Sequence, residues 1–327
     1  MVALGIEAVK AINIEVSSKC NAGCPFCSRR QKVRPYAGQL IALADFKLLP
    51  ADLIQRLRRL TFGGNFGDLC CNPDVLEIAA YIRRLNPDII LEGDTNGSSG
   101  DAAWWQALGA SFQKGAMVFA LDGLADTHRR HRRGTDFHKI IENMRAFVSG
   151  GGSAQWQFIV FKHNEHQLQA AEDLARAIGC RRFYALASRD FSPDLAPPEM
   201  IEFRIKREVF TDYRQGLEGC DRQALCRPLV DGTIYIAADG SVHPCCYAHL
   251  MYITEHNAKF GFIAPLVEKY HERISFKTRP LAEILQGAYF REVFEKARTN
   301  AYCQTKCNRF RKQIRRQLVI RDRFFDQ

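Results

Sequence analysis

Residues 12–27 read INIEVSSKCNAGCPFC, a short apolar run that is followed at once by three closely spaced cysteines. Cys20, Cys24 and Cys27 fall in one loop, which also contains a glycine and a proline. Thiolates this close together can bind three irons of one four-iron cluster, and the fourth iron then stays open for a substrate or cofactor group. A zinc site completed by a distant histidine or cysteine is the alternative, because zinc proteins also use short cysteine spacings. The loop therefore predicts a metal centre, and an open iron favours chemistry over a structural role.

The apolar run at residues 12–16 is the first of six similar runs. We expect strands at residues 12–16, 59–62, 89–94, 117–122, 155–161 and 182–187. Apolar residues recur at helical spacing between these runs, most clearly at residues 73–85, 137–149 and 165–178. Alternating strands and helices predict an α/β fold, either a doubly wound sheet or most of a (β/α) barrel. Both architectures place ligand-binding loops at the carboxyl ends of the parallel strands.

The composition is that of a globular protein of 327 residues, with 46% hydrophobic residues and a formal net charge of +10. This length suits one large domain and a smaller one. Residues 1–10 contain no cationic stretch followed by a long apolar run, so we expect a cytoplasmic protein without a secretory signal or a membrane span. A reducing compartment disfavours disulfides, which makes the twelve cysteines candidate metal ligands. The positive charge suits an anionic substrate, a phosphate-bearing cofactor or nucleic acid, and is also compatible with a solvated surface.

The series of strands and helices ends at residues 188–198, which are rich in proline, aspartate and serine and indicate a linker. In the smaller region that follows, we expect a charged helix at 199–217, a hairpin of residues 233–237 and 241–243, and a basic helix at 308–323. Half of the cysteines lie in this region, at Cys220, Cys226, Cys245, Cys246, Cys303 and Cys307. Four thiolates brought together by a small fold would occupy every iron of a cluster. Such a closed cluster suits electron transfer or structural support.

A CxxxCxxC motif directly after a first strand resembles the radical SAM superfamily, and the likeness extends over the first two thirds of the chain. The resemblance implies a partial (β/α)6 TIM-like barrel at residues 5–190. This barrel would bind S-adenosylmethionine (SAM) and a 4Fe-4S cluster, with Cys20, Cys24 and Cys27 as the iron ligands. In that family the amino and carboxylate groups of SAM chelate the fourth iron. An electron from the cluster cleaves SAM to methionine and a 5′-deoxyadenosyl radical, which abstracts a hydrogen from the substrate.

Weaker motifs at the predicted strand ends match the SAM-binding segments of the family. The resemblance places Phe26 against the adenine, the glycine-rich segment 63–68 at the amino group of SAM, and the segment 95–97 at the ribose. Glycines in the first of these segments would let the backbone approach the ligand. Arg132 would bind the methionyl carboxylate, since a guanidinium can bind a carboxylate bidentately. Two positions depart from the pattern, because Asp68 stands where many relatives have glutamate and Ala120 where they have serine. The expected SAM contacts are Phe26, Gly64, Asn65, Gly67, Asp68, Thr95, Asn96, Arg132 and Gln157.

The C-terminal cysteines resemble the SPASM and twitch extensions of the same family. The shared features are a cysteine closely followed by proline, a Gly-x-Val-x-Pro-Cys hairpin and a closing cysteine pair. The resemblance implies a small α+β domain at residues 191–327 with an auxiliary 4Fe-4S cluster. Its expected ligands are Cys226, Cys245, Cys303 and Cys307. Cys246 is an alternative ligand to Cys245, or a free thiol that donates a hydrogen atom to a substrate radical, or a packing residue. We assign Cys70, Cys71 and Cys180 to packing.

The resemblance implies one of several reactions, because relatives with auxiliary clusters oxidise, cross-link, epimerise or decarboxylate peptides and small polar metabolites. The interpretation that we favour is a two-electron oxidation of a small polar or anionic metabolite, in which the auxiliary cluster accepts an electron from the substrate radical. The alternatives are epimerisation or cross-linking of a peptide, modification of RNA or a nucleotide through the basic tail, and a non-enzymatic metal-cluster protein that binds nucleic acid. We expect an electron donor such as flavodoxin or ferredoxin, and no membrane partner.

Overall fold

The computed structural model describes residues 4–32, 34–188, 190–200, 226–254, 261–300, 303, 307 and 319–325. The chain forms two compact units, and each unit is assembled from separate segments of the sequence. Unit 1 comprises Met1–Cys20, Cys27–Glu92 and Asp221–Arg309, and unit 2 comprises Asn21–Phe26, Gly93–Cys220 and Phe310–Gln327. The domain division expected from the sequence, at residues 5–190 and 191–327, stays a prediction.

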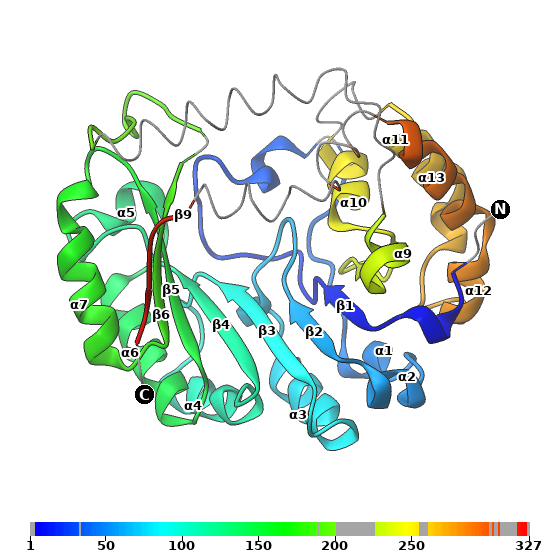
Figure 1. The fold of residues 1–327 in the computed structure, drawn as a ribbon, viewed down its shortest axis with the longest axis horizontal. Helices are drawn as coiled ribbons and strands as arrows, with labels where there is room; N and C mark the ends of the chain where they lie inside the picture. Colours follow the sequence, from blue (N-terminus) through cyan, green and yellow to red (C-terminus); the bar gives the residue numbers. More distant parts are fainter. Residues whose placement is uncertain are drawn as a thin grey trace. The chain divides into compact units, whose positions relative to one another are not determined.

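The six predicted strands are all present, and their ends differ from the expected ones by at most two residues. β1 pairs in parallel with β2 in unit 1, and β5 pairs in parallel with both β4 and β6 in unit 2. Helices connect consecutive strands, as Figure 1 shows. The predicted α/β fold of the partial-barrel class is thereby confirmed. The strands are β1 (Ala11–Ile14), β2 (Arg59–Phe62), β3 (Ile90–Thr95), β4 (Gly115–Ala120), β5 (Ala154–Val160) and β6 (Arg182–Ala187).

In unit 1 the strand order is β8-β7-β1-β2, so β1 is an inner strand. Ala11 lies opposite Arg59 of β2 on one side and opposite Thr233 of β7 on the other. Ile12 and Ile14 of β1 are fully buried, as an inner strand with apolar side chains requires. The helices that follow β1 and β2 are α1 (Leu43–Phe46), α2 (Ala51–Arg56) and α3 (Val75–Leu85).

In unit 2 the strand order is β4-β5-β6-β9. Its core includes the rings of Trp105, Phe119 and Phe147, whose neighbouring centroids lie 5.1 and 5.7 Å apart. Gly109 permits close packing of two helices, because a Cβ there would lie 2.2 Å from the carbonyl oxygen of Phe147. The last helix ends at Gly179, whose φ of 89° suits the C-terminal stop that the sequence predicts. The helices are α4 (Ala102–Ser111), α5 (His128–His131), α6 (Phe137–Ser149) and α7 (Leu168–Ile178).

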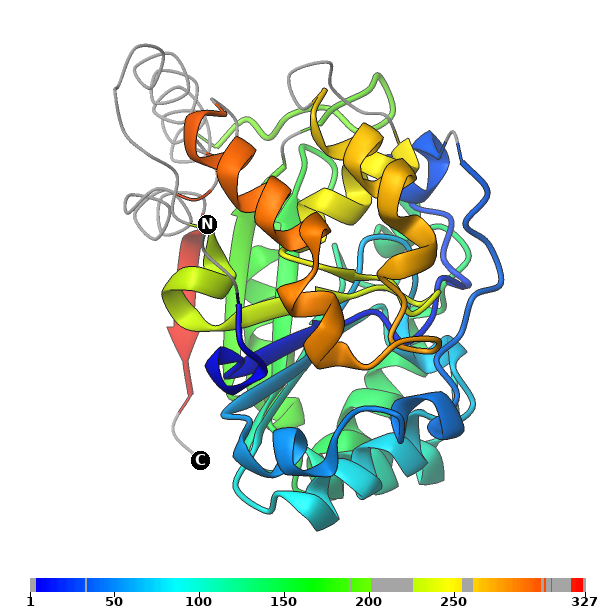
Figure 2. The ribbon, with the colours of Figure 1, turned by 90° about the vertical axis from the view of Figure 1, so that its right-hand side faces the viewer.

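The predicted C-terminal hairpin is present, and it extends the sheet of unit 1 beyond β1. β7 (Thr233–Ile236) pairs antiparallel with β8 (Val242–His243), and Gly240 in the turn has a φ of 91°. β7 also pairs in parallel with β1. Figure 2 shows the helices of residues 263–299 side by side. The helices around the hairpin are α9 (Arg227–Asp231), α10 (Cys246–Thr254), α11 (Ile263–Tyr270), α12 (Leu281–Gln286) and α13 (Ala288–Thr299). No helix in the described ranges is long and apolar enough to cross a lipid bilayer.

The expected basic helix at residues 308–323 is wrong at its end, where the chain forms strand β9 (Val319–Phe324). β9 pairs antiparallel with the edge of β6, and Asp322 accepts two hydrogen bonds from Arg182 at 2.7 and 2.9 Å. The β-branched pair at residues 319 and 320 favours a strand, whereas the prediction weighed only the charges before it. Residues 308–318 and 201–225, which include most of the expected helix at 199–217, lie outside the described residues.

Candidate functional site

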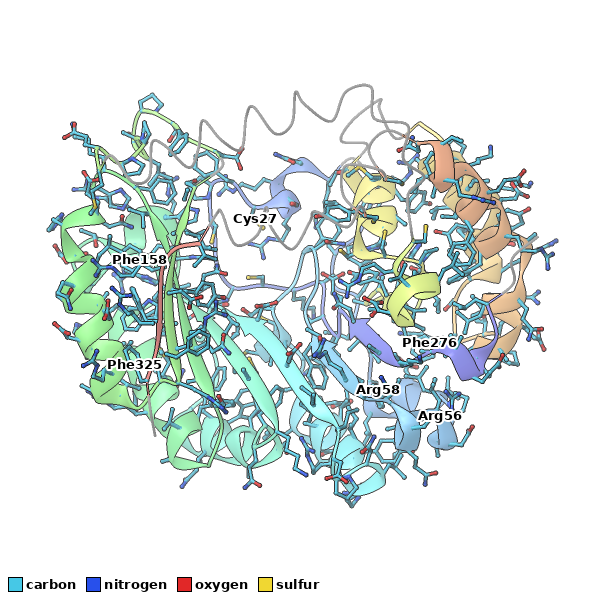
Figure 3. The ribbon with its side chains drawn as sticks, in the orientation of Figure 1. Cys27, Arg56, Arg58, Phe158, Phe276 and Phe325 are labelled. Atoms are coloured by element: carbon cyan, nitrogen blue, oxygen red, sulfur yellow. The ribbon has the colours of Figure 1, made fainter. Side chains whose placement is uncertain are left out.

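The CxxxCxxC loop begins after β1 and ends at the short 3-10 helix η2 (Ser28–Gln31). Cys27 precedes the first residue of η2 and is labelled in Figure 3. Cys20 and Cys27 belong to unit 1, whereas Cys24 belongs to unit 2. Arg29 donates a hydrogen bond to the carbonyl of Cys20, and the amide of Gly23 donates to the carbonyl of Arg133 at 2.6 Å. The backbone of the loop is therefore fixed within each unit.

Arg132, the expected carboxylate contact, is buried beside Cys24 in unit 2. Its Nε donates to Asp122 Oδ2 at 2.5 Å, and although burial lowers the pKa of Arg132, the charges of Asp122 and Cys24 keep that pKa above its usual range. Asp122 accepts two further hydrogen bonds, from His131 Nδ1 at 2.6 Å and from the amide of Ile159 at 2.7 Å. Burial raises the pKa of Asp122, but the Arg132 charge and the bonds from His131 and Ile159 outweigh burial, so the pKa lies below its usual range. Asp122 is therefore an ionised carboxylate that holds the Nε side of the Arg132 guanidinium.

The polar residues after β3 connect to the cysteine loop in unit 2. Thr95 Oγ1 accepts from the amide of Gly97 at 2.9 Å. Asn96 Oδ1 accepts from the amide of Ser98 at 3.0 Å, and its Nδ2 donates to Asn21 Oδ1 at 3.0 Å. The structure thus brings the expected ribose contacts next to the residue that follows Cys20.

The other two SAM contacts expected in unit 2 are an aromatic and an amide side chain. The Phe26 ring lies 6.1 Å from that of His131, measured between centroids. Gln157 is half-buried on β5 and accepts from the hydroxyl of Tyr184 at 3.2 Å, while its neighbour Trp156 is fully buried. Gln157 and Trp156 therefore project to opposite faces of β5.

The glycine-rich segment after β2 packs against the strand that leads into the cysteine loop. A Cβ at Gly64 would lie 2.3 Å from Glu15 Cγ, and one at Gly67 would lie 1.6 Å from the carbonyl oxygen of Ser17. Contacts inside unit 1 thus require both glycines, and their expected role in ligand approach stays a prediction. Asp68 caps the 3-10 helix η3 (Leu69–Cys71) by accepting from the amide of Cys70 at 3.0 Å.

Glu15 is a buried carboxylate at the centre of this packing, and the sequence analysis missed it. Its Oε1 accepts from the amides of Phe66 and Gly67 at 2.7 and 3.0 Å. Its Oε2 accepts from the hydroxyls of Tyr36 and Tyr235 at 2.9 and 3.1 Å. Burial raises the pKa of Glu15 in spite of these four hydrogen bonds. A charged residue inside the apolar run 12–16 was the signal that could have identified it.

Asn65 joins the glycine-rich segment to the C-terminal region within unit 1. Its Nδ2 donates to the carbonyl of Cys246 at 2.9 Å and to the hydroxyl of Tyr235 at 3.3 Å. The Cys246 side chain is half-buried against the apolar cluster that contains Tyr36 and Phe66. Cys246 therefore lies close to a segment expected to bind SAM.

The four cysteines expected to bind the auxiliary cluster all belong to unit 1 and are partly buried. Burial, together with charge repulsion from neighbouring thiols, raises the pKa of Cys226 and Cys303 to about 12 and raises that of Cys245 well above its usual range. Thiolates that partial burial and neighbouring negative charge disfavour fit the cationic irons of a cluster, because metal binding stabilises them.

No three side chains of histidine, cysteine, aspartate or glutamate in the described ranges converge as ligands of one metal ion. A four-iron cluster does not need such convergence, since each thiolate binds a different iron. Of the remaining cysteines, Cys180 is buried as a packing residue, which raises its pKa to about 12. Cys70 and Cys71 end η3, and Cys220 lies outside the described residues.

Two buried histidines lie beside the C-terminal cysteines. The Ser241 hydroxyl donates to Asp239 at 2.6 Å, so it accepts from His243 Nε2 at 2.9 Å. Burial lowers the pKa of His243 to about 3, and the neutral ring accepts from the Tyr289 hydroxyl at Nδ1, at 2.8 Å. His249 is buried among aromatic rings, and neither ring nitrogen has a hydrogen-bond partner among the described residues.

Comparison with known families agrees with these two groups of cysteines. The model of the Radical SAM superfamily matches residues 14–176, and that of the SPASM iron-sulfur cluster-binding domain matches residues 226–308. No curated protein matches the sequence.

Similar solved structures include SuiB of Streptococcus suis bound to its precursor peptide SuiA, with 13% identity and a TM-score of 0.58 over 89% of this chain and 67% of that one. They also include anSMEcpe with bound AdoMet, with 15% identity and a TM-score of 0.58 over 92% of this chain and 87% of that one. At these identities the likeness concerns the fold. The two family models and the shared fold show that the chain belongs to the radical SAM superfamily and carries a SPASM domain, so that SAM and 4Fe-4S clusters are its cofactors.

Proposed function

We propose that this radical SAM enzyme cleaves SAM reductively, abstracts a hydrogen from its substrate and completes a two-electron oxidation. The observation that carries the proposal is the SPASM match over residues 226–308, which contain four partly buried cysteines, because four cysteine ligands would close an auxiliary cluster. A closed cluster has no iron for a substrate and suits the removal of an electron from a substrate radical. We propose Cys226, Cys245, Cys303 and Cys307 as its ligands.

We propose Cys20, Cys24 and Cys27 as ligands of the SAM-binding cluster. When bound, the cluster and SAM together supply the 5′-deoxyadenosyl radical that attacks the substrate. The chain itself positions the binding segments. Glu15 fixes two amides of the glycine-rich segment, and Asn96 fixes the loop after β3 against Asn21. Fixed donors and acceptors of this kind hold a ligand without further ordering cost.

We propose the following SAM contacts on the basis of their positions at strand ends. The partly exposed Phe26 ring would face the adenine, and Thr95 and Asn96 would face the ribose. Gly64, Asn65, Gly67 and Asp68 would form the segment at the amino group, and Arg132 and Gln157 would complete the set. The partial burial of Gln157 supports its place, since it leaves part of the amide accessible to a ligand.

A peptide is the substrate class that we propose first. The solved structures of SuiB and anSMEcpe include complexes with peptides, and both share the fold of this chain. A small polar or anionic metabolite, which suits the net charge of +10, is the second candidate. The electron donor would be a flavodoxin or ferredoxin.

Anaerobic reconstitution tests the cluster ligands. We expect about eight irons per chain, and about four after Cys226→Ala or after joint replacement of the first three cysteines by alanine. The matched control is Cys180→Ala, which removes a buried packing cysteine and should keep all irons. After reduction with dithionite, wild-type protein should convert SAM to 5′-deoxyadenosine. Retention of a SAM-binding cluster after loss of Cys20, Cys24 and Cys27 would disprove the assignment.

Deuterium transfer tests the substrate class. Deuterated cell extract is separated into a peptide fraction and a small-metabolite fraction, and each is incubated with reduced enzyme and unlabelled SAM. We expect deuterium in 5′-deoxyadenosine only with the peptide fraction, because the abstracted hydrogen comes from the substrate. Transfer from the metabolite fraction alone would replace the peptide by the second candidate.

A further inference from the structure

His131 lies in an aromatic cluster of unit 2 that includes Phe26 of the cysteine loop. The centroid of its ring lies 6.1 Å from that of Phe26 and 5.0 Å from that of Phe161. The Phe161 ring also stacks on His163, with 5.5 Å between the centroids and an interplanar angle of 17°. All four rings belong to unit 2. Phe26 comes two residues after Cys24, so the cluster reaches the loop that we propose to bind the irons.

Asp122 fixes the tautomer of the His131 ring. Its Oδ2 lies 2.6 Å from His131 Nδ1, and its side chain is fully buried. Burial raises the pKa of Asp122, but the Arg132 charge and the hydrogen bond from His131 outweigh burial, so the pKa lies below its usual range. An ionised carboxylate can only accept hydrogen bonds, so His131 Nδ1 carries the hydrogen. In the neutral ring Nε2 is then an acceptor.

The Nε2 atom of His131 is an acceptor in a nearly buried place. Among the described residues none forms a hydrogen bond with it, since the ring is paired only through Nδ1, and the side chain is 7% exposed. An acceptor that stays unpaired in such a place costs free energy, so a donor on a bound ligand is favourable there. In adenine the 6-amino group is the donor, whereas N7 and the other free ring nitrogens accept.

We propose that His131 Nε2, with its ring held by Asp122, accepts a hydrogen bond from the 6-amino group of the SAM adenine. The inference rests on the proposed function, in which Phe26 faces the adenine. A base that packs against Phe26 comes close to the neighbouring His131 ring, whose centroid is 6.1 Å away. A site that pairs a buried polar group with a ligand N–H rejects an analogue that lacks this N–H, because the buried group then stays unpaired. His131 thereby makes the site specific for adenine.

The experiment compares two ligands that differ only at position 6 of the base, namely SAM and its analogue with purine in place of adenine. Both ligands share the methionyl group, so a change in the binding of that group affects both affinities equally. Calorimetry measures binding to anaerobically reconstituted full-length protein at pH 8, without a reductant, so that SAM is not cleaved.

We compare wild type with His131→Phe, which keeps an aromatic ring and removes the acceptor. The matched control is His163→Phe in the same cluster, because the His163 ring nitrogens have no hydrogen-bond partner among the described residues. Wild type should bind SAM about tenfold more tightly than the purine analogue, as expected for one net hydrogen bond. His131→Phe should abolish this preference, and His163→Phe should keep it. A preference that survives in His131→Phe overturns the inference.

The wild-type protein alone also decides the question, and it separates this inference from the proposed function. If wild type binds both ligands with equal affinity, the contact with His131 is refuted and the SAM site stands. If wild type binds neither ligand, the proposed SAM site is wrong and the contact with His131 is refuted with it.

Discussion

Replacing Glu15 with glutamine tests the packing of the glycine-rich segment, because the two side chains have the same shape. Glutamine can still accept from the amides of Phe66 and Gly67, but it presents an NH2 group to the Tyr36 and Tyr235 hydroxyls that now donate to Oε2. At the position of Oε2, protonated Glu15 carries one hydrogen and the amide nitrogen of glutamine carries two. One more buried donor is then without an acceptor, which costs about 1–3 kcal/mol.

The cost of Glu15→Gln should depend on pH with a known sign. Burial raises the pKa of Glu15 in the folded protein above its ordinary value of 4.5. The folded state therefore binds the proton more tightly than the unfolded state, and the stability from this group is present at acid pH. It is lost as the pH rises from 4.5 through the raised pKa of the folded state. Glutamine does not titrate, so the variant should lose about 1–3 kcal/mol at pH 5 and less at pH 8.

Urea unfolding of the iron-free protein, under anaerobic reducing conditions from pH 5 to 8, measures this difference. The matched control is Glu92→Gln, because Glu92 pairs with Arg59 at a half-exposed site and should change the free energy of unfolding little. The reasoning is refuted if Glu15→Gln equals this control throughout, or if its cost grows with rising pH.

Two further substitutions test contacts in unit 1 by the same urea assay. Gly67→Ala places a Cβ 1.6 Å from the carbonyl of Ser17, so the backbone must shift; we expect a loss of about 3 kcal/mol, and weaker SAM binding by calorimetry on reconstituted protein. A wild-type free energy of unfolding would contradict this. Tyr289→Phe leaves His243 Nδ1 without its donor and should cost about 1–2 kcal/mol. Tyr270→Phe removes a hydroxyl that donates to the more accessible Glu292, so it should cost less free energy of unfolding. Equal losses in the two variants would show that the buried bond to His243 contributes no more than the accessible one.

The strand series was predictable because each apolar run is local and ends at clear signals. The helix at Phe137–Ser149 has the bounds expected from its periodicity, and Gly179 ends α7 as its conformational freedom suggests. β9 was not predictable in this way, since its pairing depends on β6, more than a hundred residues earlier in the chain. The run of charged residues before Val319 favoured a helix in the prediction. The chain forms a strand from Val319 instead, because it pairs there with the edge of β6.

In the candidate site, too, features set by neighbouring residues in the sequence were predictable, and features set by distant residues were not. The spacing of Cys20, Cys24 and Cys27 is written in eight consecutive residues, and a short spacing limits what such thiols can bind. The spacing of the cysteines does not reveal the partner of Arg132, because Asp122 contacts Arg132 only when β4 and α5 have folded. The sequence could suggest that Arg132 binds an anion, but it could not show that a buried carboxylate already occupies its Nε.

The glycine-rich segment shows that packing inside unit 1 can require the same glycines that a ligand-binding motif predicts. Gly64 and Gly67 were expected to admit a ligand, and a Cβ at either position would instead collide with Glu15 or Ser17 of the preceding strand region. The same segment reaches the C-terminal region through Asn65, which donates to the carbonyl of Cys246. β7 pairs with β1 directly beside these contacts, so the hairpin that precedes Cys245 and Cys246 and the segment expected to bind SAM share one buried network. A substitution at Glu15 should therefore disturb both regions of unit 1, although the sequence presents them as separate motifs.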